Sequence, residues 1–264
     1  TIVPSLAPLL GSGIIALGGW RGIFVAFVIF AVISSTWVNA RLSEPLPAGA
    51  RRPLNLTALW TALQEMMSYP MVRNSIYVQS LIFSVLFTSI SLIQPTFDQI
   101  FGKADQFALY FFAIGIFCAS SSVVNATFVM RLGMRAIISI AIFVTLTLSL
   151  LMLALHLSGV TETVYFWAYV FWQTALFFQM GLTIGNLNAL AMEPLGHIAG
   201  LAASVMGAIS TVAAGVIATL IAQMFDGTTL PQIGGVLVLL ALAIPALIRM
   251  RSLDRPLAAP VHSE

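Results

Sequence analysis

The sequence predicts an all-α protein that crosses a membrane several times, and two observations support this class. Hydrophobic residues make up 59% of the 264 residues and charged residues only 8%, with a mean hydropathy of +1.01. Soluble domains carry about 25% charged residues, so a water-soluble fold could not bury this much apolar surface. The apolar residues also collect in long stretches, and about 20 such residues span a bilayer as a helix. The period-two alternation that a membrane β-barrel requires is missing.

Eight stretches are predicted to span the membrane as helices, because backbone groups in hydrocarbon must be paired within the protein. The first stretch is shorter than the others, and the sixth and seventh are long enough to tilt or to extend beyond the bilayer. The predicted spans are Ile2–Leu17, Gly22–Ala40, Ser75–Thr96, Gln106–Met130, Ala136–Leu157, Val164–Ala191, Ile198–Met224 and Ile233–Ile248.

One long connection, residues 41–73, divides the chain into two spans followed by six. Its first half is rich in Pro, Ala and Gly and predicts irregular structure. Its second half predicts a short helix with Asn55 as its N-cap, because apolar residues recur there at helical spacing. This helix either lies on the membrane surface or packs on protein, and both interpretations remain open. The recurring apolar residues are Leu56, Leu59, Trp60, Leu63 and Met67.

The basic residues predict the orientation of the spans. If the spans alternate in direction, nine arginines fall on one side of the membrane, and Arg21 and Lys103 fall on the other. Cytoplasmic loops carry the excess of Lys and Arg, so the linker and the C-terminus are predicted to be cytoplasmic. The nine arginines are Arg41, Arg51, Arg52, Arg73, Arg131, Arg135, Arg249, Arg251 and Arg255.

The sequence argues against several classes of function. With Cys118 as its one cysteine, the chain can form neither an internal disulfide nor a thiol metal cluster, and we expect no metal and no cofactor. Long charged tails are absent, so we expect no nucleic-acid partner. An H-E-x-x-H motif, a G-x-S-x-G turn and paired aspartates within spans are also absent, which argues against an intramembrane enzyme.

Three motifs together resemble the major facilitator superfamily, and most closely its bacterial drug/proton antiporters of the bicyclomycin-resistance type. The first comprises "APLLGS" (Ala7–Ser12) and "GWRGIF" (Gly19–Phe24), which are similar to the antiporter motif and following turn of that family's fifth helix. Ala7 and Ser12 replace the first and last glycines of the motif. The second is "RLGMR" (Arg131–Arg135), and the third is the turn within Gly185–Ile209. Their order, their spacing and the long basic linker agree with the family over essentially the whole chain.

The resemblance implies a bundle of 12 helices, of which about eight are present, so that the chain begins near the fifth helix. Residues 1–40 would hold the last two helices of an N-terminal bundle, and residues 41–73 a cytoplasmic linker. Residues 74–250 would form a six-helix C-terminal bundle, and residues 251–264 a cytoplasmic tail. We therefore expect a truncated fragment that inserts into the membrane but does not transport by itself.

The first span is predicted to lie where the two halves of such a protein meet. Pro8 would kink this helix, because proline removes a backbone hydrogen bond. In the resembling family the kinked helix contacts the other half of the molecule. Pro8, Gly11 and Gly13 are therefore predicted to support packing between the first span and the fourth.

Amide and aromatic side chains form stripes on three of the predicted spans. Such stripes suit a cavity for a lipophilic solute, with flat apolar walls and a few hydrogen-bonding groups. The alternative is that the amides form hydrogen bonds between helices, which are common in membrane bundles. The candidate cavity residues are Gln79, Phe83, Phe87, Gln94, Tyr110, Ser121, Asn125, Tyr165, Tyr169 and Gln173.

Two short loops carry further candidate residues. Arg131 and Arg135 flank Gly133 and either form a cytoplasmic latch or simply anchor the chain by the positive-inside rule. Glu193 and His197 either form the charged pair of a gate or mark a tight turn.

Together these features predict a secondary active transporter that exports a lipophilic drug or a small metabolite. Acidic residues fall in loops, tails or near membrane surfaces, with Asp98 closest to the membrane, so no carboxylate for proton coupling is evident within a span. The alternatives are a non-transporting membrane scaffold or receptor and, less favoured, an intramembrane enzyme. The expected partners are the lipid bilayer of a bacterial inner membrane and a small-molecule substrate, with protons as a candidate coupling ion. We expect a monomer.

Overall fold

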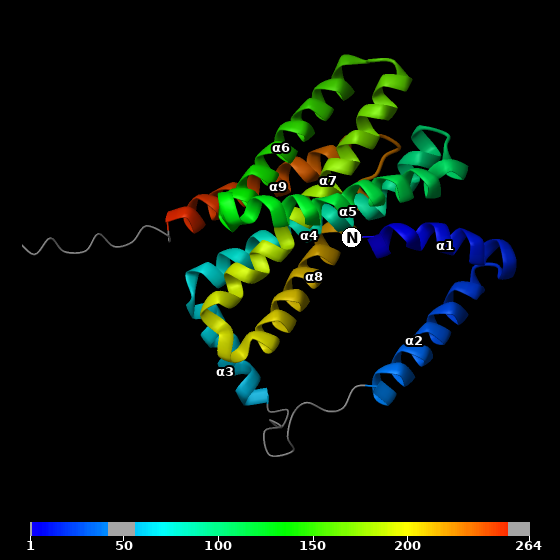
Figure 1. The fold of residues 1–264 in the computed structure, drawn as a ribbon. Helices are drawn as coiled ribbons and strands as arrows, with labels where there is room; N and C mark the ends of the chain where they lie inside the picture. Colours follow the sequence, from blue (N-terminus) through cyan, green and yellow to red (C-terminus); the bar gives the residue numbers. More distant parts are fainter. Residues whose placement is uncertain (1, 42–55, 253–264) are drawn as a thin grey trace, which may run out of the picture.

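A computed structural model of the chain describes residues 2–41 and 56–252, and these residues form long helices without strands (Figure 1). All eight predicted spans are helices, and their ends differ from the predicted ends by at most five residues. The longer helices are α1 (Ile2–Gly18), α2 (Arg21–Arg41), α3 (Leu56–Ser68), α4 (Pro70–Pro95), α5 (Phe107–Leu132), α6 (Met134–Ser158), α7 (Glu162–Met192), α8 (Ala199–Gln223) and α9 (Leu230–Ser252).

Six helical stretches of the described chain are long and apolar enough to cross a membrane. One of them, Glu162–Gln223, contains both α7 and α8, which are joined by the 3₁₀ turn η4 (Glu193–Ile198). Leu195 in this turn has non-helical backbone angles and separates the two helices. α1 has 17 residues, at the lower end of the lengths that cross a bilayer, and is not among these six. The predicted class, an all-α protein with several membrane-spanning helices, is therefore confirmed.

Glycines with positive φ separate neighbouring helices. Gly133, at φ 80° and ψ 154°, lies between α5 and α6, in a backbone region that is essentially restricted to glycine. Gly159 ends α6 in the left-handed conformation at φ 65°. The chain can therefore reverse direction at these two points within one or a few residues.

Helices α4 to α9 form a bundle in which α4 lies at the centre. α4 packs against α7, α8 and α9, while α6 packs on α7 and α9 and α5 packs on α7. Aromatic side chains cluster where α7 meets the π-helix η2 (Thr96–Ile100), which continues α4. There the ring centroid of Phe97 lies 5.6 Å from that of Phe166. These aromatic contacts fix one end of the bundle.

The hairpin of α1 and α2 lies beside the bundle (Figure 1). α1 packs along α5, and α2 packs on α1. None of the 21 described residues of α2 is buried, and Phe27 and Phe30 are both largely exposed. The assignment of this hairpin to an N-terminal bundle stays a prediction.

Helix α3 packs on protein through one of its faces. Met66 is fully buried and belongs to a cluster that includes Leu195 in η4 and Met206 on α8. Trp60 on another face is 59% exposed, so this ring is free to contact a membrane surface. Of the two interpretations of this helix, the structure shows packing on protein for the face that carries Met66. Asn55, its predicted N-cap, lies outside the described residues.

We predict that Met66→Ala releases α3 from the bundle. Truncating a fully buried methionine typically costs about 2–5 kcal/mol, because apolar contacts are lost and a cavity remains. Limited proteolysis of the purified chain should then cut within residues 56–68 several times faster than in the wild type. Trp60→Ala, at an exposed position of the same helix, is the matched control and should leave the rate unchanged. Equal rates for both variants would contradict the packing.

Candidate functional site

The predicted stripe on α4 divides between a covered and an uncovered face. Gln79 is only 2% exposed and lies on the side that packs within the bundle. Phe83 and Phe87 are half-buried, with ring centroids 6.3 Å apart, and Gln94 near the end of the helix is exposed. Two rings and one amide therefore share the less covered face of the central helix.

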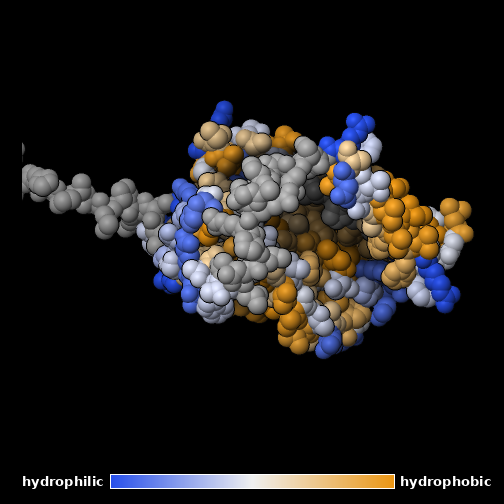
Figure 2. All heavy atoms as spheres, turned by 90° about the horizontal axis from the view of Figure 1, so that it is seen from below, coloured by the Kyte–Doolittle hydropathy of each residue, from blue (hydrophilic) through white to orange (hydrophobic). Residues whose placement is uncertain are grey.

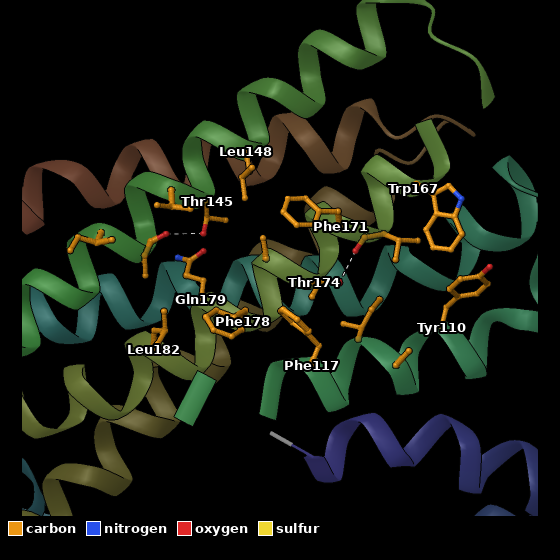
Figure 3. Close-up of a pocket in the computed structure, with 17 residues that line it drawn as sticks. Tyr110, Phe117, Thr145, Leu148, Trp167, Phe171, Thr174, Phe178, Gln179 and Leu182 are labelled. Atoms are coloured by element: carbon orange, nitrogen blue, oxygen red, sulfur yellow. Dashed lines mark hydrogen bonds between the residues drawn. The ribbon is translucent and has the colours of Figure 1, made fainter. Parts of the chain in front are cut away.

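The stripe on α5 has three different environments. Tyr110, near the start of the helix, is half-buried at a groove between α5, α6 and α7 (Figure 3). Ser121 is buried, and its hydroxyl donates to the carbonyl of Cys118 in its own helix. Asn125 accepts a hydrogen bond at 2.7 Å from the side-chain amide of Asn186 on α7. Asn125 therefore joins two helices.

The three candidates on α7 belong to two groups of hydrogen-bonded side chains that join helices. Tyr169 is fully buried, and its hydroxyl donates to Gln232 Oε1 on α9 at 2.9 Å. Gln173 Nε2 donates to the same hydroxyl at 2.7 Å. The hydroxyl of Tyr165 lies 2.9 Å from His156 Nδ1 on α6. This pairing favours hydrogen bonds between helices over an open cavity for these three residues.

These hydrogen bonds, together with the pair of Asn125 and Asn186, include four residues that were not among the predicted site residues, namely His156, Asn186, Thr229 and Gln232. Thr229 Oγ1 contacts both the Tyr165 hydroxyl and His156 Nδ1. The sequence did hold a signal for two of these residues, because an amide within an apolar span requires a partner.

The predicted interface residues lie on α1, which contacts α5 as expected. Gly11 is half-buried and Gly13 exposed, and a Cβ atom added at either position would meet no heavy atom within 4 Å. Neither glycine is therefore required for close approach in this arrangement. Pro8 lies within α1, and its side chain is not among those that the structure describes. The predicted role of Pro8, Gly11 and Gly13 in packing at an interface stays a prediction.

The loop candidates lie at the end of the bundle where α3 packs. Arg131 is exposed at the end of α5, and Arg135 is half-buried in the first turn of α6, on either side of Gly133. His197 in η4 is paired with Glu65 on α3, with 2.9 Å between His197 Nε2 and Glu65 Oε1. Glu193 is exposed in the same turn. This hydrogen-bonded contact joins η4 to α3, and a gate at Glu193 and His197 stays a prediction.

Apart from the half-buried Glu65 on α3, the acidic residues of the described chain lie at exposed positions near helix ends. Asp98 is exposed in η2. Asp226, in the turn between α8 and α9, accepts hydrogen bonds from the hydroxyl and backbone N–H of Thr228, which lower the pKa of its carboxyl group. Within the described residues, no three His, Cys, Asp or Glu side chains are close enough together to hold a metal ion.

A recess opens between the α1–α2 hairpin and the bundle, beyond the contact of α1 with α5. Viewed from the end where α3 lies, a hollow with mainly hydrophobic walls opens between them (Figure 2). On α8, Val212, Val216 and Leu220 form an exposed stripe at helical spacing. Apolar surface of this kind suits either lipid or a lipophilic solute.

We predict that Tyr169→Phe destabilises the bundle by about 1–2 kcal/mol, because one hydroxyl holds two buried amides. Thermal unfolding of the purified chain in detergent, followed by tryptophan fluorescence, measures this loss. Tyr77→Phe, at a 44% exposed tyrosine on α4, is the control and should shift the transition little. Unchanged stability of Tyr169→Phe, together with weaker solute binding, would instead favour the cavity interpretation.

Comparison with known proteins agrees with the predicted resemblance. The family model of the Major Facilitator Superfamily matches residues 1–222. A bicyclomycin resistance protein homolog from Haemophilus influenzae is 22% identical over 238 residues, which cover 88% of this chain and 58% of that protein. The chain thus spans a little over half the length of this relative. Because the family match covers most of the chain and its helices follow the predicted order, the protein belongs to the Major Facilitator Superfamily.

Proposed function

We propose that the protein is a secondary active transporter that exports a lipophilic drug or a small metabolite across a bacterial inner membrane. Membership of the Major Facilitator Superfamily supports transport, and the name of the Haemophilus relative supports a drug as the solute. The observation that carries the proposal is the recess between the α1–α2 hairpin and the bundle (Figure 2). Transporters of this kind bind their solute between two helical bodies that rock against each other.

The less covered face of α4 is the wall that we assign to the solute. Phe83 and Phe87 offer ring faces, and Gln94 offers an amide NH₂ group as donor and an amide oxygen as acceptor. A lipophilic solute gains from apolar contact with the rings, while the amide fixes its orientation. A cationic solute would also gain from cation–π contact with these rings.

Proton coupling is proposed for the complete protein rather than for the described bundle. A coupling carboxylate needs a position within the membrane that both sides can reach in turn. The described acids at Asp98, Glu193 and Asp226 are instead exposed near helix ends. This arrangement leaves protons as a candidate coupling ion without assigning the residue that would carry them.

We predict that Phe87→Ala and Gln94→Leu lower efflux of the lipophilic cation ethidium about five- to tenfold, the effect of one lost ring contact or hydrogen bond. The measurement is ethidium fluorescence in bacteria that express the protein from its complete coding sequence. Leu242→Ala, at an exposed position on α9, is the control, and this variant should export ethidium at the wild-type rate. Absence of flux for ethidium and for other lipophilic solutes in the wild type would favour a scaffold or receptor.

We further propose that the α5–α6 turn, the linker and the C-terminus face the cytoplasm. Arg41, Arg73, Arg131 and Arg249 lie at helix ends that alternation places on one side, and the hydrogen bond between His197 and Glu65 joins α3 to that same side.

The orientation predicts how introduced cysteines react in intact cells. In a Cys118→Ser background, a membrane-impermeant maleimide should label Ser158→Cys at the α6–α7 turn from outside. Arg131→Cys should react only after the cells are lysed. Both native residues are exposed, so both cysteines are expected to be accessible to reagent on their own side. The reverse pattern would refute the proposed orientation.

A further inference from the structure

A second apolar hollow lies on the flank of the bundle, between α5, α6 and α7 (Figure 3). Its volume is about 850 Å³, and nearly all of its lining is aliphatic or aromatic. Phe117 on α5 and Phe171 on α7 form its rim and are 60% and 63% exposed. Since these three helices span the membrane, a groove with exposed apolar rims opens sideways to the bilayer rather than to water.

The groove runs from a membrane surface to the middle of the bilayer. At one end, Tyr110 and Trp167 lie with ring centroids 6.0 Å apart, near the starts of α5 and α7. Aromatic residues of this kind favour the membrane interface. Gln179 lines the groove two residues past the midpoint of the 31-residue α7. At about 1.5 Å per residue, it lies roughly 18 Å along the helix from Trp167.

Gln179 is the feature that distinguishes this groove from ordinary lipid-facing surface. The residue is 2% exposed, and both its amide nitrogen and its amide oxygen lack a hydrogen-bond partner. Its amide points across the groove toward Thr145 on α6 (Figure 3). The threonine hydroxyls in the lining, Thr145 and Thr174, already donate to carbonyls of their own helices.

The depth of Gln179 decides between two occupants. A phospholipid would place its ester and headgroup near the interface and only hydrocarbon at the midplane, where it would leave the amide unpaired. A solute with its own donor and acceptor at mid-depth would pair both amide atoms. Other described buried polar atoms without partners, such as Gln79 Oε1 on α4, Gln173 Oε1 on α7 and Gln232 Nε2 on α9, do not line the groove.

We infer that this groove is a lateral binding site for a lipophilic solute that carries an amide-like donor and acceptor, with Gln179 as the residue that recognises it. The solute would enter from the bilayer between Phe117 and Phe171 and slide along the groove until its polar group meets Gln179. The inference rests on the proposed function for the class of solute, and it adds a site that is separate from the recess between the α1–α2 hairpin and the bundle.

The test uses the 264-residue chain in phospholipid nanodiscs with two photoreactive probes. One is an N-alkylbenzamide that carries a diazirine, and the other is the diazirine-tagged alkylbenzene of the same length, which lacks the amide. Mass spectrometry locates the crosslinked residues, and the concentration for half-maximal labelling measures affinity. We expect saturable labelling of α5, α6 and α7 at the groove by the amide probe.

Gln179→Leu should raise the half-maximal concentration of the amide probe about tenfold, the effect of one to two hydrogen bonds, and should leave the alkylbenzene unaffected. Gln223→Leu, at an exposed glutamine outside the groove, is the matched control and should change neither probe. Ala175→Phe should fill the groove and reduce labelling by both probes.

Competition on the wild-type chain gives a readout that does not depend on any variant folding. Unlabelled benzamide should displace the amide probe, and unlabelled alkylbenzene of equal length should displace it at least tenfold less well. Equal competition, or an amide probe that never labels the groove, would overturn the inference and leave a hydrocarbon surface for lipid chains. Groove labelling without ethidium efflux would refute transport but keep the groove as a binding site. Ethidium efflux without groove labelling would support transport but refute the groove as a binding site.

Discussion

The need to pair every backbone and side-chain polar group within hydrocarbon is the constraint on which this structure depends. Backbone pairing makes each span a helix, because a helix satisfies its own N–H and C=O groups. The same rule applies to polar side chains, which pair either with a carbonyl of their own helix, as Ser121 does, or with a side chain of a neighbouring helix. The Tyr169 hydroxyl meets this need between α7 and α9, and the Asn125 side chain meets it between α5 and α7.

Most of the fold followed from the sequence because hydropathy and turn chemistry are local properties. An apolar run of about 20 residues is already enough to identify a span, and glycines such as Gly133 and Gly159 mark where the chain turns. The short helix α3 was also predictable from its spacing of apolar residues. Its packed face was not, since burial of Met66 depends on η4 and α8, which lie more than a hundred residues away in sequence.

The candidate site was harder to predict, because in lipid a helix no longer shows its buried face by a contrast between apolar and polar residues. In water, a helix shows its buried side as an apolar stripe, whereas in a membrane both the packed side and the lipid side are apolar. Phe83 and Phe117 therefore look alike in sequence, although Phe83 is half-buried on the central helix and Phe117 is 60% exposed at a groove. Polar residues carry more information, but a pattern cannot tell a paired amide from an unpaired one.

Helix α7 shows how that distinction separates packing from recognition. It carries Gln173, Gln179 and Asn186 within 14 residues, and any of the three could have been assigned to a cavity from the sequence alone. Gln173 Nε2 is paired with Tyr169, and Asn186 Nδ2 is shared between Asn125 and the carbonyl of Leu182. In Gln179 both amide atoms are unpaired, and this residue alone of the three lines the groove. Gln173 leaves only its amide oxygen without a partner, so an amide with both atoms unpaired at mid-membrane costs more free energy than either neighbour. A partner supplied from outside the chain would recover that cost, which is the physical basis for assigning recognition to Gln179 and packing to the other two.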